Sequence, residues 1–156
     1  MANHSGSCSC GAVRYELTAE PIIVHACHCR DCQKQTGGAF AINAVIEASN
    51  VKVLQGAPEA VEMTTESGRP HDIYRCPECR VALWSDYGRR RTIYFIRVAT
   101  LDDPAALPPD VHIYTRSKLP YVGLPEGADV FEGFYNPREY WSEEAAARWA
   151  AATEAS

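Results

Sequence analysis

Seven cysteines in three short clusters constrain the fold of this 156-residue chain more than any other feature. The clusters are Cys8-Ser-Cys10, Cys27-His-Cys29-Arg-Asp-Cys32 and Cys76-Pro-Glu-Cys79. Gaps of one or two residues allow neighbouring thiolates to reach one ion, each sulfur about 2.3 Å away, as tetrahedral zinc requires. Seven thiolates are one fewer than two closed four-thiolate sites need. The count therefore predicts one closed site and one site with an open coordination position, where chemistry or ligand binding would occur.

The length and composition indicate a single globular domain, residues 1–156, with 46% hydrophobic and 22% charged residues. No apolar run approaches the roughly 20 residues of a membrane span, and the polar N-terminus lacks the plan of a signal peptide. We therefore expect a cytoplasmic protein with no membrane partner. In that reducing compartment, clustered cysteines are more often metal ligands than disulfides.

The net charge of −5 argues against nucleic acid as a partner, because an acidic chain has no electrostatic footprint for phosphate backbones. The one basic run, Arg89-Arg90-Arg91, lies between a glycine and a strand-like segment. We interpret it as a solvated hairpin turn rather than an anion site. No heptad pattern is present, so the sequence does not indicate which oligomeric state the protein adopts.

Short strands separated by turns are expected over most of the chain up to residue 115. They are placed at residues 13–17, 22–24, 39–46, 51–54, 61–65, 73–75, 81–84, 92–99 and 111–115. The proline-rich segments 102–110 and 118–129 are expected to be ordered loops. A helical turn is expected over residues 31–36, and Ser142 is a suitable N-cap for a longer helix over 142–152. The fold class is therefore mainly β with a C-terminal helix.

The pair Cys76 and Cys79 encloses a tight turn in which Pro77 fixes φ and backbone N–H groups can face the sulfurs. A second pair must complete the tetrahedron, and Cys8 and Cys10 can supply it. Such a structural zinc site would contribute of order 10 kcal/mol as an apparent binding term. A thioredoxin-like redox role is not favoured, because no βαβ pattern surrounds the motif.

The remaining cysteines, Cys27, Cys29 and Cys32, can reach one ion only from a tightly wrapped loop. Three protein ligands leave the fourth position for water or substrate, as in catalytic zinc sites. An all-thiolate site is soft and accepts a fourth sulfur readily. A thiol bound there would be held as a thiolate, which is the reactive nucleophile. We therefore interpret this group as a thiol-capturing centre rather than a hydrolytic one.

Four segments of the sequence, taken together, resemble the glutathione-dependent formaldehyde-activating enzyme family. They are Cys8-Ser-Cys10-Gly11, the run from Cys27 to Gly37, Cys76-Pro-Glu-Cys79 and the later His112-Ile-Tyr114. The resemblance covers about residues 5–115. It implies a β-tent fold, in which short antiparallel sheets are held together by zinc, with two zinc ions per chain. By matching positions, the structural zinc would be held by Cys8, Cys10, Cys76 and Cys79, and the catalytic zinc by Cys27, Cys29 and Cys32.

The activity implied by this resemblance is the condensation of glutathione, or a similar thiol, with formaldehyde or another small aldehyde. The enzyme would be a carbon–sulfur lyase that resembles S-(hydroxymethyl)glutathione synthase. One departure concerns Arg80, which stands where the family commonly has glycine after the second CxxC pair. This arginine is expected to reshape the turn or the entrance to the site.

Several further residues are candidates for the site. We predict His112 as a catalytic residue beside the three cysteines, with a core role as the alternative, and His25 is a candidate fourth ligand. His28 and Asp31 could move a proton, but we favour a solvent-facing His28 and an Asp31 that caps the following turn. His71 is expected at the surface. The candidates for binding the glutathione carboxylates, with ordinary surface charge as the alternative, are Arg30, Lys34 and Arg80.

Two other functions remain open. A zinc-stabilised binding module without catalysis would have closed coordination at both sites, as expected if a histidine completes the second set of ligands. A thiol redox or metal-buffer protein would lose zinc reversibly on mild oxidation and form disulfides among the three clustered cysteines. An enzyme would instead exchange its fourth zinc ligand for the substrate thiol.

Overall fold

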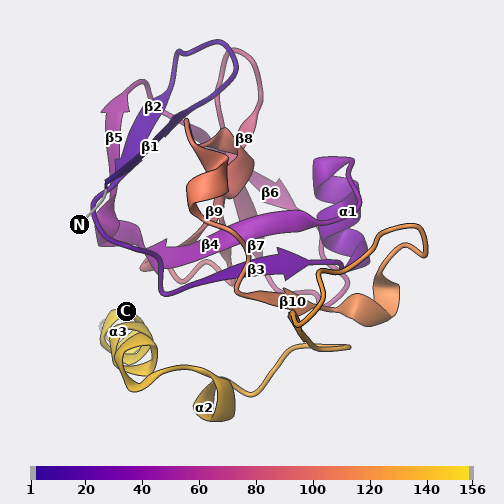
Figure 1. Ribbon diagram of the computed structural model, residues 1–156. Coiled ribbons are helices and arrows are strands. Elements are labelled where there is room, and N and C mark those ends of the chain that lie inside the picture. Colours follow the sequence, from indigo (N-terminus) through magenta and orange to yellow (C-terminus); the bar gives the residue numbers. More distant parts are fainter. Residues whose placement is uncertain (1–2, 155–156) are drawn as a thin grey trace.

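The structure is a computed structural model and describes residues 3–154 (Figure 1). The strands are β1 (His4–Ser7), β2 (Arg14–Leu17), β3 (Ile23–Cys27), β4 (Ala41–Glu47), β5 (Val51–Gln55), β6 (Glu59–Met63), β7 (His71–Arg75), β8 (Ala82–Tyr87), β9 (Ile93–Arg97), β10 (Val111–Ile113) and β11 (Asp129–Val130). The α-helices are α1 (Arg30–Thr36), α2 (Pro137–Tyr140) and α3 (Glu143–Glu154). The prediction of a mainly β protein with a C-terminal helix is therefore confirmed.

The strands form two sheets. A three-stranded sheet has the order β1-β2-β5, and an eight-stranded sheet has the order β11-β10-β3-β4-β9-β8-β7-β6. Neighbouring strands are antiparallel except at one edge, where β10 runs parallel to both β3 and β11. The parallel pair places Ile113 opposite Cys27, so a segment late in the chain supports the strand that ends at the second cysteine cluster.

The two sheets pack on a shared apolar core, which includes Tyr15, Leu17, Trp84 and Ile96. The Tyr15 ring meets Trp84 edge to face with centroids 5.2 Å apart, and its hydroxyl is 2.6 Å from Thr100 Oγ1. Gly6 lies against this tyrosine, and a Cβ at Gly6 would come within 2.7 Å of the Tyr15 ring and of the Thr100 carbonyl. Only glycine therefore lets β1 pass this close to the core.

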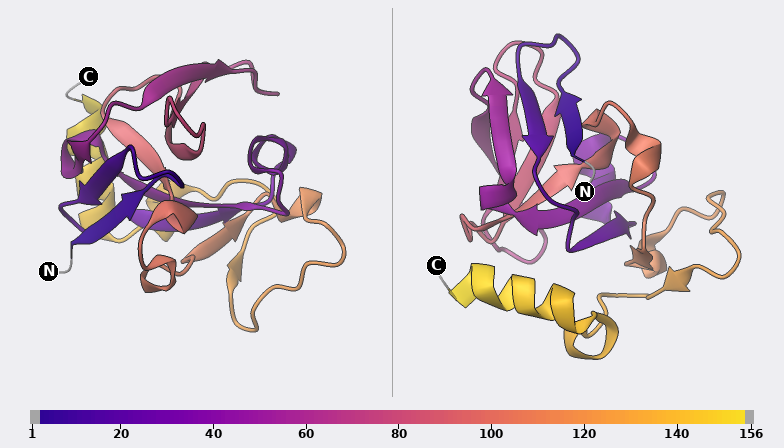
Figure 2. Two further views of the ribbon diagram at one scale, coloured as in Figure 1. Left: turned by 90° about the horizontal axis from the view of Figure 1, so that it is seen from above. Right: turned by 60° about the vertical axis from the view of Figure 1, so that its left-hand side comes forward.

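The C-terminal helix α3 lies against the side of the large sheet that faces away from the small sheet (Figure 2). Its N-terminus is capped by Ser142, whose Oγ accepts from the Ala145 N–H at 3.1 Å, as the sequence predicts. Trp141 and Trp149 pack edge to face, with centroids 5.4 Å apart, and join the second apolar cluster. Arg148 fixes the helix to β4 through two 2.7 Å contacts with the Glu47 carboxylate.

The expected strands are present within one to three residues of their predicted ends, and residues 61–63 pair with β7 as predicted. The sequence did not reveal β1, β11 or α2, because each is short. Between residues 3 and 154, no helix is long and apolar enough to cross a membrane.

We predict that Arg148→Gln loosens α3. The ion pair with Glu47 is only partly exposed. Burial alone would raise the pKa of Glu47, but hydrogen bonds from Arg148, from the backbone and from Asn50, together with the charge of Arg148, lower it. Loss of this pair should cost about 1–3 kcal/mol. Amide hydrogen exchange should therefore become about 5- to 100-fold faster in α3 while β4 stays protected. Arg138→Gln, at an exposed side chain in α2, is the control and should leave the exchange unchanged.

Candidate metal centres and the adjoining cavity

The first candidate centre, called here the four-cysteine cluster, joins two turns that are far apart in sequence. Its ligand atoms are the Sγ atoms of Cys8, Cys10, Cys76 and Cys79, which all lie within 4.8 Å of one another. Two of the sulfur–sulfur distances are 3.6 and 3.7 Å. A tetrahedron with bonds of 2.3 Å has edges of about 3.8 Å, so the sulfurs already have the spacing that a tetrahedral ion requires.

Backbone geometry holds these sulfurs in place. The N–H of Val13 points at Cys8 Sγ at 3.3 Å, and the N–H groups of Glu78 and Cys79 point at Cys76 Sγ at 3.4 and 3.5 Å. Donors of this kind favour thiolates, which is what a metal ligand must be. The predicted grouping of these four cysteines and the predicted turn geometry are therefore both observed.

Arg80 follows Cys79 and completes the turn of this cysteine pair. Its φ is 68°, in the left-handed region that glycine adopts without strain. The backbone N–H of Arg80 donates to the Cys76 carbonyl at 3.0 Å, which closes the turn. The arginine therefore takes a backbone conformation typical of glycine, and a reshaped turn or site entrance stays a prediction. Its side chain pairs with Glu59 at 3.4 Å, beside the four-cysteine cluster.

The second candidate centre, called here the triplet, consists of Cys27, Cys29 and Cys32, whose sulfurs also lie within 4.8 Å of one another. Cys27 ends β3, Cys29 is the N-cap of α1, and Cys32 lies in the first turn of that helix. Cys29 Sγ accepts the N–H of Cys32 at 3.3 Å, and Gly37 ends the helix with a φ of 70°. The strand-to-helix transition is thus the tightly wrapped loop that the sequence predicts.

The pKa values of the triplet thiols are shifted in opposite directions, as expected for crowded thiols that could bind a cation. Hydrogen bonds from Cys27 and Cys32 lower the pKa of Cys29 to about 2, whereas hydrogen bonds with Cys29 and Cys32 raise the pKa of Cys27. Without a cation, the cluster therefore stabilises one thiolate at the expense of the other two thiols. A divalent ion would balance three thiolates to a net charge of −1, so the donor set fits a bound metal.

A buried arginine balances this negative charge. Arg97, on β9, is 7% exposed, and among the described residues it forms no ion pair with a carboxylate. Burial lowers its pKa, while the Cys32 and Cys27 sulfurs oppose that shift. Nη1 donates to Asn43 Oδ1 at 2.6 Å and Nη2 to Gln35 Oε1 at 3.2 Å. No pattern in the sequence indicates this role, because the segment that forms β9 is mostly apolar.

Gln35 in turn orients His71. Because its Oε1 accepts from Arg97, its amide nitrogen faces His71 Nδ1, at 3.3 Å. That ring nitrogen must accept, so the proton of the neutral imidazole lies on Nε2. Burial and then the charge of Arg97 lower the pKa of His71 to about 4, which keeps the ring neutral at pH 7. Nε2 is buried without a partner among the described residues. The whole His71 residue is only 7% exposed, so the prediction that it lies at the surface is wrong.

The triplet opens on a cavity of about 650 Å³. One wall comes from α1 and from the loop between β6 and β7, a second from the turn between β8 and β9, and a third from the C-terminal segment. The C-terminal wall is apolar and aromatic, and consists of Phe134, Pro137, Trp141 and Trp149. His71 and Arg97 also line the cavity, as do Arg30, Asp31, Arg69 and Arg90.

Other candidate residues take different positions. His28 is fully buried and its Nε2 is 3.1 Å from His112 Nδ1, so its expected solvent-facing position is wrong. His112 lines a separate cavity behind the triplet, of about 540 Å³. His25 Nε2 is bonded to the Tyr135 hydroxyl at 2.6 Å and lies outside both cysteine groups. Asp31 does not cap α1; its carboxylate accepts the Glu66 N–H at 3.1 Å.

The three cations proposed to bind carboxylates are also separated. Arg30 lines the triplet cavity, where its side chain donates to Gln33 Oε1. Lys34 lies on the same helix but does not line the cavity. Arg80 belongs to the surroundings of the four-cysteine cluster. Of the three, only Arg30 is thus placed to contact a ligand beside the triplet.

Comparison with known proteins gives a consistent result. Residues 3–117 match the family described as "Glutathione-dependent formaldehyde-activating enzyme". A Halomonas elongata protein provisionally named as such an enzyme is 28% identical over 124 residues, which are 76% of this chain and 79% of that protein. A Sordaria macrospora protein with the same provisional name is 34% identical over 83 residues, or 53% of this chain and 33% of that protein. A crystal structure of a Rhodobacter sphaeroides protein has a TM-score of 0.48 and 24% identity, and the match covers 63% of this chain and 87% of that one.

We predict that Arg80→Gly increases the free energy of unfolding of the metal-loaded protein by about 1 kcal/mol, because it removes left-handed strain while losing only an exposed ion pair. Urea unfolding followed by circular dichroism would measure it. Lys52→Gly, in the extended backbone of β5 and also with one exposed ion pair, is the control and should reduce stability by a similar amount. A destabilised Arg80→Gly variant would contradict the prediction, since the arginine contacts would then outweigh the strain.

Proposed function

The chain belongs to the glutathione-dependent formaldehyde-activating enzyme family, and on this premise we propose that it joins a thiol such as glutathione to formaldehyde or another small aldehyde at the triplet. The enzyme would be classed as a carbon–sulfur lyase that acts in the direction in which the carbon–sulfur bond of the adduct forms. The observation that carries the proposal is the contrast between the two clusters. One has a complete set of four sulfurs, whereas the other has three and adjoins a cavity.

We propose Zn²⁺ as the ion of both clusters, two per chain, because sets of three or four thiolates suit zinc. The ion of the four-cysteine cluster would stabilise the fold. When bound at the triplet, zinc would supply a Lewis acid with one coordination position left for a thiol, and would favour the thiolate form of that thiol. Arg97 supports this role, because its buried charge offsets the remaining negative charge of the three cysteines.

The proposed reaction is the addition of a thiolate sulfur to the carbonyl carbon of the aldehyde. A carbon–sulfur bond forms, the π electrons of the carbonyl move to its oxygen, and that oxygen takes up the proton that the thiol released. No redox step is involved. The walls of the cavity would hold the two reactants together, and this orientation converts an encounter in solution into a reaction within one complex.

His71 is the residue that we propose to stabilise the oxygen. Its neutral Nε2–H is a donor without a partner among the described residues, and its tautomer is set by Gln35. A neutral imidazole donates to a developing oxyanion without first having to lose or gain a proton. For His112 we propose a positioning role, because it lines the separate cavity and contacts the triplet loop through His28.

The first test is two-dimensional exchange NMR on formaldehyde plus glutathione, with and without the zinc-loaded protein. We predict faster exchange with the protein, and a return to the uncatalysed rate in Cys32→Ser, which removes one of the three triplet ligands. Metal analysis should find two zinc ions per wild-type chain. Circular dichroism checks that the variant is folded. Full acceleration by a folded Cys32→Ser variant would refute the proposal. Absence of acceleration by the wild type would favour a non-catalytic, zinc-stabilised binding module.

The role of His71 is tested by the pair His71→Phe and His71→Gln. Phenylalanine removes the donor while keeping a planar ring, and should reduce kcat about 100-fold with little change in KM. Glutamine retains an N–H donor and should recover part of the loss. Because the pKa of His71 is held at about 4, the wild-type rate should show no loss from protonation of this residue between pH 8 and pH 6. Equal losses in both variants would indicate a structural role instead.

A further inference from the structure

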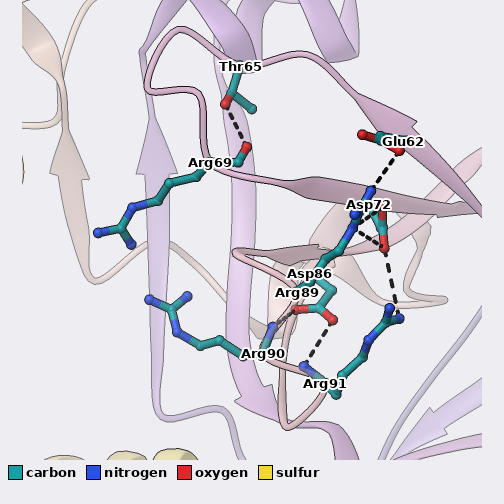
Figure 3. Close-up of polar contacts among 8 residues, drawn as sticks. All are labelled: Glu62, Thr65, Arg69, Asp72, Asp86, Arg89, Arg90 and Arg91. Atoms are coloured by element: carbon teal, nitrogen blue, oxygen red, sulfur yellow. Dashed lines mark hydrogen bonds and ion pairs between the residues drawn. The ribbon is translucent and has the colours of Figure 1, made fainter.

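Two arginines on facing loops converge at the triplet cavity. Arg69 lies in the loop between β6 and β7, and Arg90 in the turn between β8 and β9. Figure 3 shows their guanidinium groups directed toward the same space from the two loops. Two like charges repel each other in this arrangement, and each guanidinium offers a planar fork of N–H donors.

Three nearby carboxylates, those of Glu62, Asp72 and Asp86, are already engaged by other groups. Arg89 contacts Glu62 at 2.8 Å and Asp72 at 3.0 Å, and Arg91 reaches Asp72 at 3.9 Å. The carboxylate of Asp86 accepts two backbone N–H groups of the same turn, at 2.8 and 3.0 Å (Figure 3). Among the described residues, therefore, no carboxylate forms an ion pair with Arg69 or Arg90.

Arg90 belongs to the basic run that the sequence suggested was a solvated turn; the run does form a turn, but the Arg90 side chain lines the cavity and is held in a defined position. Its Nη1 donates to the Tyr87 carbonyl at 2.8 Å, and its guanidinium lies 5.2 Å from the ring centroid of Trp149. Burial, followed by the charge of Arg69, lowers its pKa, so a bound anion would relieve an unfavourable environment. Arg69 is exposed at the cavity mouth, and its side chain has no hydrogen bond among the described residues. One rigid and one adjustable cation thus face a shared space.

The cavity as a whole is positive although the chain carries a net charge of −5. It is lined by the five arginines Arg30, Arg69, Arg90, Arg97 and Arg116, against the two carboxylates Asp31 and Glu66. A local excess of cations in a concave site attracts small anions against the overall charge. Trp149 lies beyond the segment that matches the family, so part of the support for Arg90 comes from residues outside that segment.

We propose that Arg69 and Arg90 form a carboxylate clamp, which binds a carboxylate of the thiol substrate while its sulfur meets the triplet. This assignment rests on the proposed function for the thiol, but the clamp itself depends only on the two guanidinium groups. A carboxylate accepts two N–H bonds from a guanidinium in one plane, which suits paired arginines. The cavity volume of about 650 Å³ is in the range that encloses a small peptide-like ligand.

The test is calorimetric titration of the zinc-loaded protein with glutathione and with its diethyl ester, in which both carboxylates are masked. Arg69→Gln and Arg90→Gln should each weaken glutathione binding about 10- to 100-fold, and the ester should bind the wild type correspondingly less tightly. Arg91→Gln is the matched control, because it removes the same charge from the same turn outside the cavity, and it should change affinity less than about 5-fold.

A sulfur-free tripeptide, with 2-aminobutyrate in place of the cysteine, separates the clamp from thiol capture. If it binds the wild type and loses affinity in Arg69→Gln and Arg90→Gln, the clamp is supported even where no adduct chemistry is detected. Unchanged glutathione affinity in both arginine variants would overturn the clamp. So would an ester that binds as tightly as the free acid, or a wild type that binds neither tripeptide.

Discussion

Crowded cysteine sulfurs are the constraint on which the rest of this structure depends. Sulfur atoms 3.6–3.7 Å apart are held by turns whose N–H groups point at them, and a cation is what allows all of them to be thiolates together. The four-cysteine cluster connects the turn after β1 with the turn before β8. It therefore links the small sheet to the large one, in addition to the apolar core that the two sheets share.

The triplet imposes a different requirement, because its negative charge lies close to the interior. Arg97 meets that requirement from β9, and its hydrogen bond to Gln35 extends the same network to His71. Electrostatic balance and orientation of a hydrogen-bond donor thus come from one chain of contacts. The buried charge of Arg97 and the hydrogen-bond donor of His71, for which we propose a role in stabilising the reacting oxygen, are coupled through a single glutamine.

Local patterns predicted much of this arrangement. Cysteine spacing separated the two clusters correctly, the alternation of apolar residues placed most strands, and Ser142 marked the start of α3. The predictions for isolated polar residues were weaker. His28 and His71 are both buried, Asp31 does not cap its helix, and two of the three proposed carboxylate-binding cations lie away from the cavity. A histidine or arginine in a strand has no local pattern that reports which neighbouring strand will cover it.

The sequence by itself determined the two groups of candidate metal ligands, the mainly β architecture and the family, because these depend on spacing over a few residues and on motifs in a defined order. Only the tertiary structure decided which charges surround the triplet. The side chains in question come from separate loops and strands: Arg69, His71, Arg90 and Arg97. The successive pairing of β6 with β7, β7 with β8 and β8 with β9 brings them to one cavity. The aromatic wall from the C-terminal segment is likewise placed by the packing of α3 on the sheet. Long-range pairing and burial set these positions, and neither is encoded in a short stretch of sequence.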